Sequence, residues 1–72
     1  SKIQKWCIKH GYGEGIDCLV RDFKDCMEIN SDDTVIKILD STHKLSRECG
    51  ISIQEILLHL MFLKESKNDN SF

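Results

Sequence analysis

Cysteine and histidine side chains in the first part of the chain have the chemistry of zinc ligands. In sequence order they are Cys7, His10, Cys18 and Cys26. Zinc takes thiolate and imidazole ligands in a tetrahedron, and Cys7 with His10, three residues apart on a helix, could supply two of them. The spacing lacks the paired C-x2-C knuckles of structural zinc sites, and Cys26 also fits an apolar helical stripe. The sequence therefore predicts neither a metal site nor a bound cofactor.

The cysteines could alternatively form disulfides. Cys7, Cys18, Cys26 and Cys49 allow three pairings, and their spacing selects none of them. The first residues show no signal-peptide pattern, so we expect a cytoplasmic protein, in which thiols stay reduced. Cys7, Cys26 and Cys49 lie on predicted core faces, whereas Cys18 lies off its apolar stripe and is expected to be exposed.

The three histidines stand outside any known nucleophile motif. His10, His43 and His59 have no adjacent Ser or Cys in such a pattern, and the sequence contains no P-loop, G-x-S-x-G or H-E-x-x-H motif. The glycine-rich stretch 11–15 lacks the spacing of a dinucleotide-binding loop. His43 lies among polar residues and is expected to be exposed. We therefore expect that the chain is not an enzyme and takes no small-molecule substrate.

Apolar residues recur at helical spacing and predict an all-α fold, a small bundle of three longer helices plus a short N-terminal helix. The short helix covers roughly residues 2–10, and the glycines of 11–15 end it. The second helix covers about 16–29, where Lys24 and Glu28 form an opposite-charge pair one turn apart. Its apolar stripe consists of Ile16, Leu19, Val20, Phe23, Cys26 and Met27.

The last two helices are separated by a short turn at Gly50, the usual residue for the left-handed end of a helix. The third helix follows the polar residues 30–33, which offer N-cap chemistry. Ser52 and Glu55 form a capping box that begins the last helix, about 53–66. The short connections imply that successive long helices are neighbours in space. The stripe of the third helix consists of Val35, Ile38, Leu39, Thr42, Leu45 and Cys49.

The chain of 72 residues is long enough for one domain only. We expect residues 1–66 to form a single helical domain and residues 67–72 to form a polar, disordered tail. The formal net charge is −2, so binding to nucleic acid, which relies on excess positive charge, is disfavoured. No apolar run reaches the roughly 18 residues that a membrane span needs, so no contact with a membrane is expected.

The stretch LSRECGISIQEI (45–56) resembles the centre of a DNA-binding helix-turn-helix, in which glycine occupies the turn between two angled helices. The resemblance implies that the last helix reads base edges. That helix offers Gln54, Glu55 and His59 but no Lys or Arg before Lys64, whereas contacts to bases and phosphates use polar and basic side chains. We therefore expect a protein-interaction module, and a helix-turn-helix DNA-binding transcriptional regulator is the alternative function.

The last predicted helix is apolar on two sides. Leu58 and Phe62 lie one turn apart on a second side, away from the core-facing stripe. A helix that is apolar on more than one side must be covered on more than one side. Either the N-terminal helix folds back over Leu58 and Phe62, or these residues form an exposed patch with Phe62 as its anchor. The core-facing stripe consists of Ile53, Ile56, Leu57, Leu60 and Lys64, with Met61 on its border.

These patterns favour a small helical protein–protein interaction module. We expect a regulator or assembly subunit that homo-oligomerises or docks on a larger protein. The predicted interface residues are Leu58, Phe62, Met61, His59 and Glu55.

Overall fold

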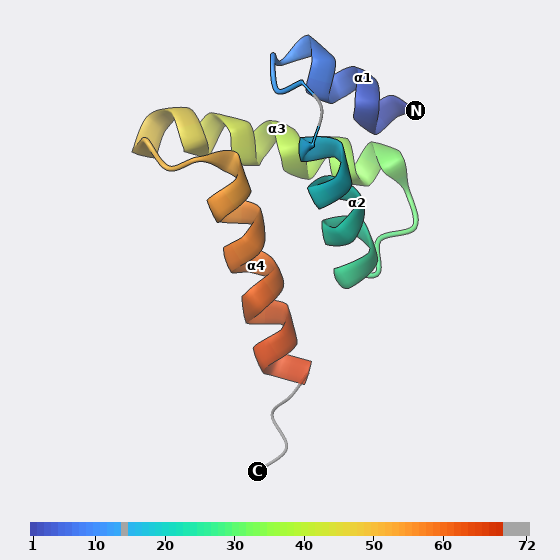
Figure 1. Cartoon of the computed structure of the whole chain (residues 1–72). Coiled ribbons are helices and arrows are strands. Elements are labelled where there is room, and N and C mark those ends of the chain that lie inside the picture. The colour runs from blue at the N-terminus through green and yellow to red at the C-terminus, as the bar shows by residue number, and fades with distance from the viewer. Residues whose placement is uncertain (14, 69–72) are drawn as a thin grey trace.

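The computed structural model describes residues 1–13 and 15–68 of the chain. These residues form α-helices joined by short connections, which confirms the predicted all-α bundle (Figure 1). None of the helices in this part of the chain is long and apolar enough to cross a membrane. In chain order the helices are α1 (Lys2–Lys9), α2 (Ile16–Cys26), α3 (Asp32–Cys49) and α4 (Ile53–Asn68).

Serine side chains begin α1, α3 and α4. Ser1, Ser31 and Ser52 each accept a hydrogen bond from the backbone N–H three residues further on, which satisfies one of the free donors at a helix N-terminus. The Ser52 contact, 3.2 Å from the N–H of Glu55, is the serine half of the predicted capping box. At its other end α3 closes at Gly50, whose φ of 71° is left-handed, as predicted.

Two helix ends differ from the expected positions. α2 ends at Cys26 rather than near residue 29, because Glu28 adopts a left-handed φ of 58° that turns the chain away. Glu28 therefore leaves the helix and does not pair with Lys24. α4 continues to Asn68, two residues past the expected end, since no Gly or Pro interrupts it and Lys67 suits the negative end of the helix dipole. The rest of the expected tail, residues 69–72, lies outside the described residues.

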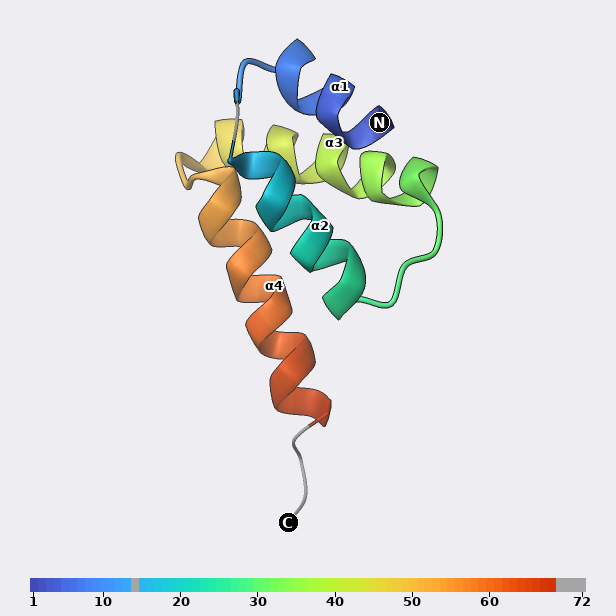
Figure 2. The ribbon, with the colours of Figure 1, turned by 45° about the vertical axis from the view of Figure 1, so that its right-hand side comes forward.

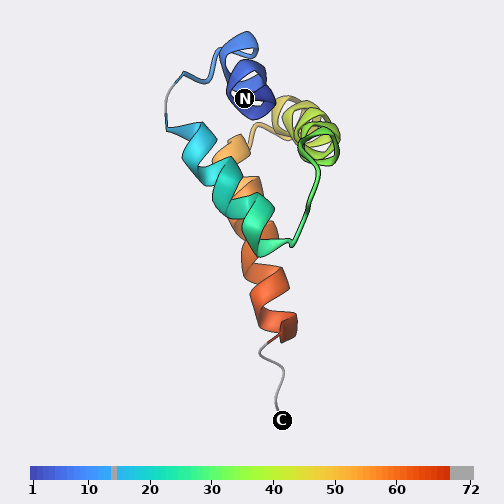
Figure 3. The ribbon, with the colours of Figure 1, turned by 90° about the vertical axis from the view of Figure 1, so that its right-hand side faces the viewer.

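The helices pack as two crossed pairs, α2 beside α4 and α1 beside α3 (Figures 1 and 3). The members of each pair run in the same direction, and contacts of α3 with α4 and of α1 with α2 join the pairs. The core between them receives side chains from all four helices. Its buried members are Ile3, Trp6, Cys7, Ile16, Val20, Phe23, Val35, Leu39, Ile53 and Leu57.

The expectation that successive long helices are neighbours is correct for α3 and α4, whereas α2 and α3, although joined by the ion pair of Lys24 and Asp32, are not a main packing pair. The connection from Met27 to Ser31 ends in extended backbone at Ser31 and carries the chain away from α2 before α3 begins. The apolar face of α2 instead packs against α4 and α1. Helices that are adjacent in sequence are thus not the main packing partners in this half of the domain.

Leu57 and Leu58 provide a matched test of this packing, because Leu57 is 0% exposed and its neighbour is 52% exposed. Leu57→Ala leaves a cavity in the core, and we expect it to lower the free energy of unfolding by about 2–5 kcal/mol. Leu58→Ala should change that free energy by less than about 0.5 kcal/mol. Urea unfolding of dilute protein, followed by circular dichroism, measures both. Equal losses in the two variants would contradict the packing of α4.

The four thiols are free and give a second test. Cys7 is buried, Cys26 is half-buried, and Cys18 and Cys49 are exposed. The predicted core position of Cys49 is wrong, because the last turn of α3 extends past α4 (Figure 1). Burial raises the pKa of the Cys7 thiol, and the nearby charge of Asp17 adds to that rise.

We expect Ellman's reagent to modify Cys18 and Cys49 in the folded protein and Cys7 only after unfolding, since both burial and a raised pKa suppress the reactive thiolate. Peptide mass spectrometry after brief labelling, with and without denaturant, assigns each site. Fast labelling of Cys7 in the folded protein would mean that α1 is not docked as described.

Candidate functional site

The helix α4 carries apolar side chains on more than one side, but the other described residues cover only one of these sides. Ile53 and Leu57 point into the core and are buried. Leu58, Phe62 and Leu63 remain 52%, 66% and 49% exposed. A helix that is apolar all round normally lies inside a larger protein or an assembly. Folding of this chain therefore leaves apolar surface on α4 uncovered.

The C-terminal half of α4 extends beyond the end of α2 (Figures 1, 2 and 3). The last contacts between the two helices lie at the end of α2, where Lys64 Nζ donates to the Cys26 carbonyl at 3.1 Å and the Cys26 thiol approaches the Met61 carbonyl at 3.9 Å. The turn at Glu28 then takes the chain toward α3. Phe62 and Leu63 lie between Met61 and Lys64 in the chain, but on sides of α4 that these contacts do not cover.

A groove runs along the corner where α3 turns into α4. It has a volume of about 490 Å³, and its walls are mainly apolar. The predicted core position of Leu45 is wrong: Leu45 and Ile51 are 46% and 45% exposed, because α4 crosses α3 instead of folding back along it (Figure 1). The residues that line the groove are Leu45, Ile51, Glu55, Ile56, His59 and Leu60.

The apolar strip of the groove continues along α4. Ile56, Leu60 and Leu63 are spaced four and three residues apart and so lie on one side of the helix. Leu60 and Leu63, together with Met27, also line a second hollow next to the groove. The uncovered apolar surface thus follows α4 from the corner with α3 toward its C-terminal half.

The predicted interface residues fall into three places. Glu55 and His59 line the groove. Leu58 and Phe62 are both exposed and form a separate ridge on another side of α4, which α1 does not cover, since α1 packs against α3 and α2. Met61 is half-buried against the core. The groove itself was not predicted, although the spacing of Ile56, Leu60 and Leu63 indicates an apolar strip separate from Leu58 and Phe62.

A second cluster of chemistry-bearing side chains joins α1 to α3. The Trp6 ring stacks on His10 with centroids 4.0 Å apart, and His43 meets both rings edge-on, with its centroid 4.9 Å from that of His10. Trp6 Nε1 donates to Asp40 at 2.8 Å, and the Tyr12 hydroxyl shares a hydrogen bond with His43 Nδ1.

His43 is therefore half-buried, and the prediction that it is exposed is wrong, because Tyr12 and the end of α1 fold over it. Burial also raises the pKa of Tyr12. Trp6 is only 6% exposed, which leaves no open ring face for a ligand. In the described residues no three His, Cys, Asp or Glu side chains come together in a way that could hold a metal ion. We interpret this cluster as the contact that docks α1.

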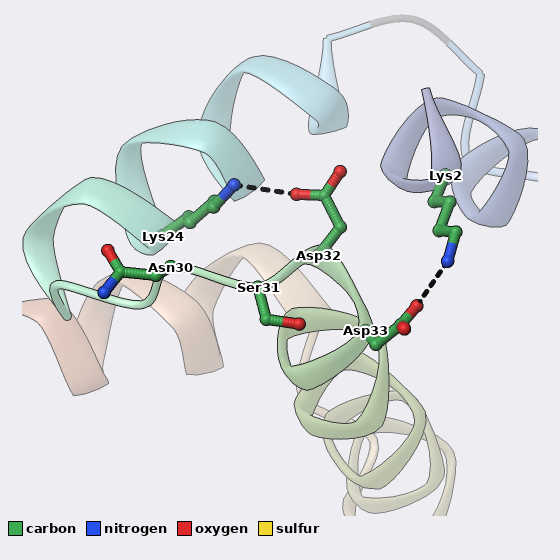
Figure 4. Close-up of a pocket in the computed structure, with 6 residues that line it drawn as sticks. All are labelled: Lys2, Lys24, Asn30, Ser31, Asp32 and Asp33. Atoms are coloured by element: carbon green, nitrogen blue, oxygen red, sulfur yellow. Dashed lines mark hydrogen bonds and ion pairs between the residues drawn. The ribbon is translucent and has the colours of Figure 1, made fainter.

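Two ion pairs meet at the first turn of α3 (Figure 4). Lys2 of α1 binds Asp33, and Lys24 of α2 binds Asp32, each with a nitrogen–oxygen distance of 2.8 Å. The hydrogen bond from Lys24 lowers the pKa of Asp32 below its ordinary value. The shallow pocket at this point is also lined by Asn30 and Ser31. Both lysines are already paired with carboxylates, so this pocket offers little attraction for an anion.

The lowered pKa of Asp32 sets a direction for the acid stability. A carboxyl group with a lower pKa in the folded state contributes stability above its unfolded value near 3.8, and this contribution is lost as the pH falls through the folded pKa. We expect Lys24→Gln to lower the melting temperature slightly at pH 6 and to have no effect near pH 2. Thermal melts of the wild type and the variant across this range check the prediction. An effect of the variant that is larger at pH 2 than at pH 6 would contradict it.

Comparisons with models of known protein families, with characterised proteins and with solved structures give no match for this chain. What the chain does must therefore follow from its own geometry, in which the uncovered apolar surface of α4 is the feature that folding leaves unexplained.

Proposed function

We propose that this chain is a small protein–protein interaction module that binds an amphipathic helix of a partner protein along α4. The observation that carries the proposal is the groove at the α3–α4 corner together with its continuation to Leu63. Amphipathic helices commonly bind other proteins by inserting apolar residues, spaced three and four apart, into a groove of this kind. The module would act as a regulator or an assembly subunit.

The composition of the groove supports a polypeptide partner. Glu55 and His59 are the polar side chains that line it, and they stand at one edge of an otherwise apolar wall. Binding sites of this composition gain affinity from the apolar contacts and orientation from the few polar groups.

The exposed thiols of Cys18 and Cys49 favour a protein that acts in a reducing compartment such as the cytoplasm.

No feature of the described residues favours the DNA-binding alternative over protein binding. α3, Gly50 and α4 do form two helices that cross at a turn. A recognition helix uses its N-terminal residues to contact base edges. On α4 the basic residues Lys64 and Lys67 lie at the other end, and Lys64 is already bound to the Cys26 carbonyl. We therefore propose protein binding alone.

A methyl-labelled NMR titration tests the function. The probe is a synthetic 16-residue amphipathic peptide with leucines at positions i, i+3, i+4 and i+7, and a scrambled peptide of the same composition serves as its control. We expect the first peptide to shift the methyl signals of Leu45, Ile51 and Leu63 and to leave that of Ile8 unchanged. Ile8 is suitable as an internal control because it is 70% exposed on α1.

The double variant Leu45→Ser, Ile51→Ser should weaken binding of the peptide at least tenfold, and Ile8→Ser should not. Because Leu45 and Ile51 are about half exposed, these changes should preserve the helical circular dichroism signal. Equal shifts with the scrambled peptide, or no shifts at the groove with either peptide at a protein concentration where the chain is monomeric, would overturn the proposed function.

A further inference from the structure

We infer that the partner on the α4 surface is a second copy of this chain, which pairs through the same surface to form a two-fold symmetric dimer. This inference rests on the proposed function, since it names the occupant of the same surface. In a two-fold dimer the same residues contribute from both copies. The surface consists of the groove and the ridge, and its exposed large apolar members are Leu45, Ile51, Leu58, Phe62 and Leu63.

The first argument is the area. These side chains are between 45% and 66% exposed. At roughly 200 Å² for a fully exposed large apolar side chain, they present about 500 Å² of apolar surface. Homodimer interfaces are about 65% apolar, so a partner that covers all of this surface would form an interface of up to about 800 Å² on each copy. That is the size of a standard stable protein–protein interface.

The second argument concerns coverage. The groove and the ridge lie on different sides of α4, so a single helix that fills the groove leaves Leu58 and Phe62 exposed. A second copy brings a broader surface, in which α4 is flanked by the corner with α3. Such a surface can contact both sides of α4 at once, as a helix that is apolar on more than one side requires.

The third argument is charge. The whole chain has a formal net charge of −2. The charged residues of α4 are Glu55, Lys64, Glu65 and Lys67, which cancel. Two copies that meet along α4 therefore bring no net like charge together. In the described residues the other large apolar side chain that is exposed, Ile8, stands alone on α1 beside Asp17 and so offers no continuous apolar surface.

Sedimentation velocity from 1 to 200 µM chain, in reducing buffer, tests the inference. Reducing conditions remove disulfide dimers through Cys18 or Cys49. We expect the wild-type mass to rise with concentration from 8.3 kDa toward twice that value. The double variant Phe62→Ser, Leu63→Ser should raise the dimer dissociation constant at least tenfold while keeping its helical signal, because both side chains are about half exposed or more. Ile8→Ser is the matched control and should sediment like the wild type.

The outcomes separate this inference from the proposed function. A wild-type chain that stays monomeric at 200 µM overturns the second copy, and if it still binds the amphipathic peptide in the groove, the proposed function stands. A monomer that also ignores the peptide overturns both. The assignment of the dimer to α4 is overturned if the Phe62→Ser, Leu63→Ser variant dimerises as tightly as the wild type. It is also overturned if Ile8→Ser dissociates the dimer. If the Phe62→Ser, Leu63→Ser variant loses part of its helical circular dichroism signal, Leu58→Ser serves as a second variant. It removes a third exposed side chain of the surface and should also weaken the dimer.

Discussion

The left-handed turn at Gly50 sets the direction of α4, and the arrangement of the other helices depends on that direction. A residue with a side chain is strained at a φ of 71°, whereas glycine adopts it freely, so α3 stops there and α4 leaves across it. Because α4 does not fold back along α3, the space beside α4 is open to α2. The same crossing leaves Leu45 and Ile51 uncovered at the corner.

Polar contacts at the helix ends add to the packed core, both within the two crossed pairs and between them. Lys2 and Lys24 tie α1 and α2 to the first turn of α3, and Lys64 ties α4 to the end of α2. Ion pairs that are open to water contribute little free energy. A chain of this length also buries only about 60% of the surface that its unfolded form exposes, less than a larger domain does. Association through α4 would therefore add stability that the isolated domain lacks, by burying apolar area that folding leaves exposed.

The helices were predictable because their signals are local. Helical spacing, serine N-caps and Gly50 identify where helices begin and end, and these features depend on residues a few positions apart. What the sequence did not reveal depends on contacts between distant segments. Leu45 and Cys49 continue the apolar stripe of α3, but only the course of α4 decides that this end of the stripe has no cover. His43 looked polar and exposed because its partner, Tyr12, lies 31 residues away.

The same reasoning divides the candidate site. The position of Leu58 and Phe62 on a second side of α4 follows from counting sides on one helix, whereas their exposure depends on where α1 packs and was left open by the sequence. The groove is formed by two helices and the turn between them. Its wall on α3 could therefore not be predicted from the pattern of α4 alone. Glu55 and His59 were predicted in one interface with Leu58 and Phe62, yet the structure places them on the groove.

Trp6 is the only tryptophan in the chain, and it sits at the contact between α1 and α3. Its indole emission therefore reports the docking of α1, while circular dichroism reports the helices as a whole. Segments of a domain can open separately, with different free energies. If α1 detaches before the other helices unfold, the fluorescence transition precedes the loss of helicity, so this molecule carries its own optical reporter for the order in which its parts come apart.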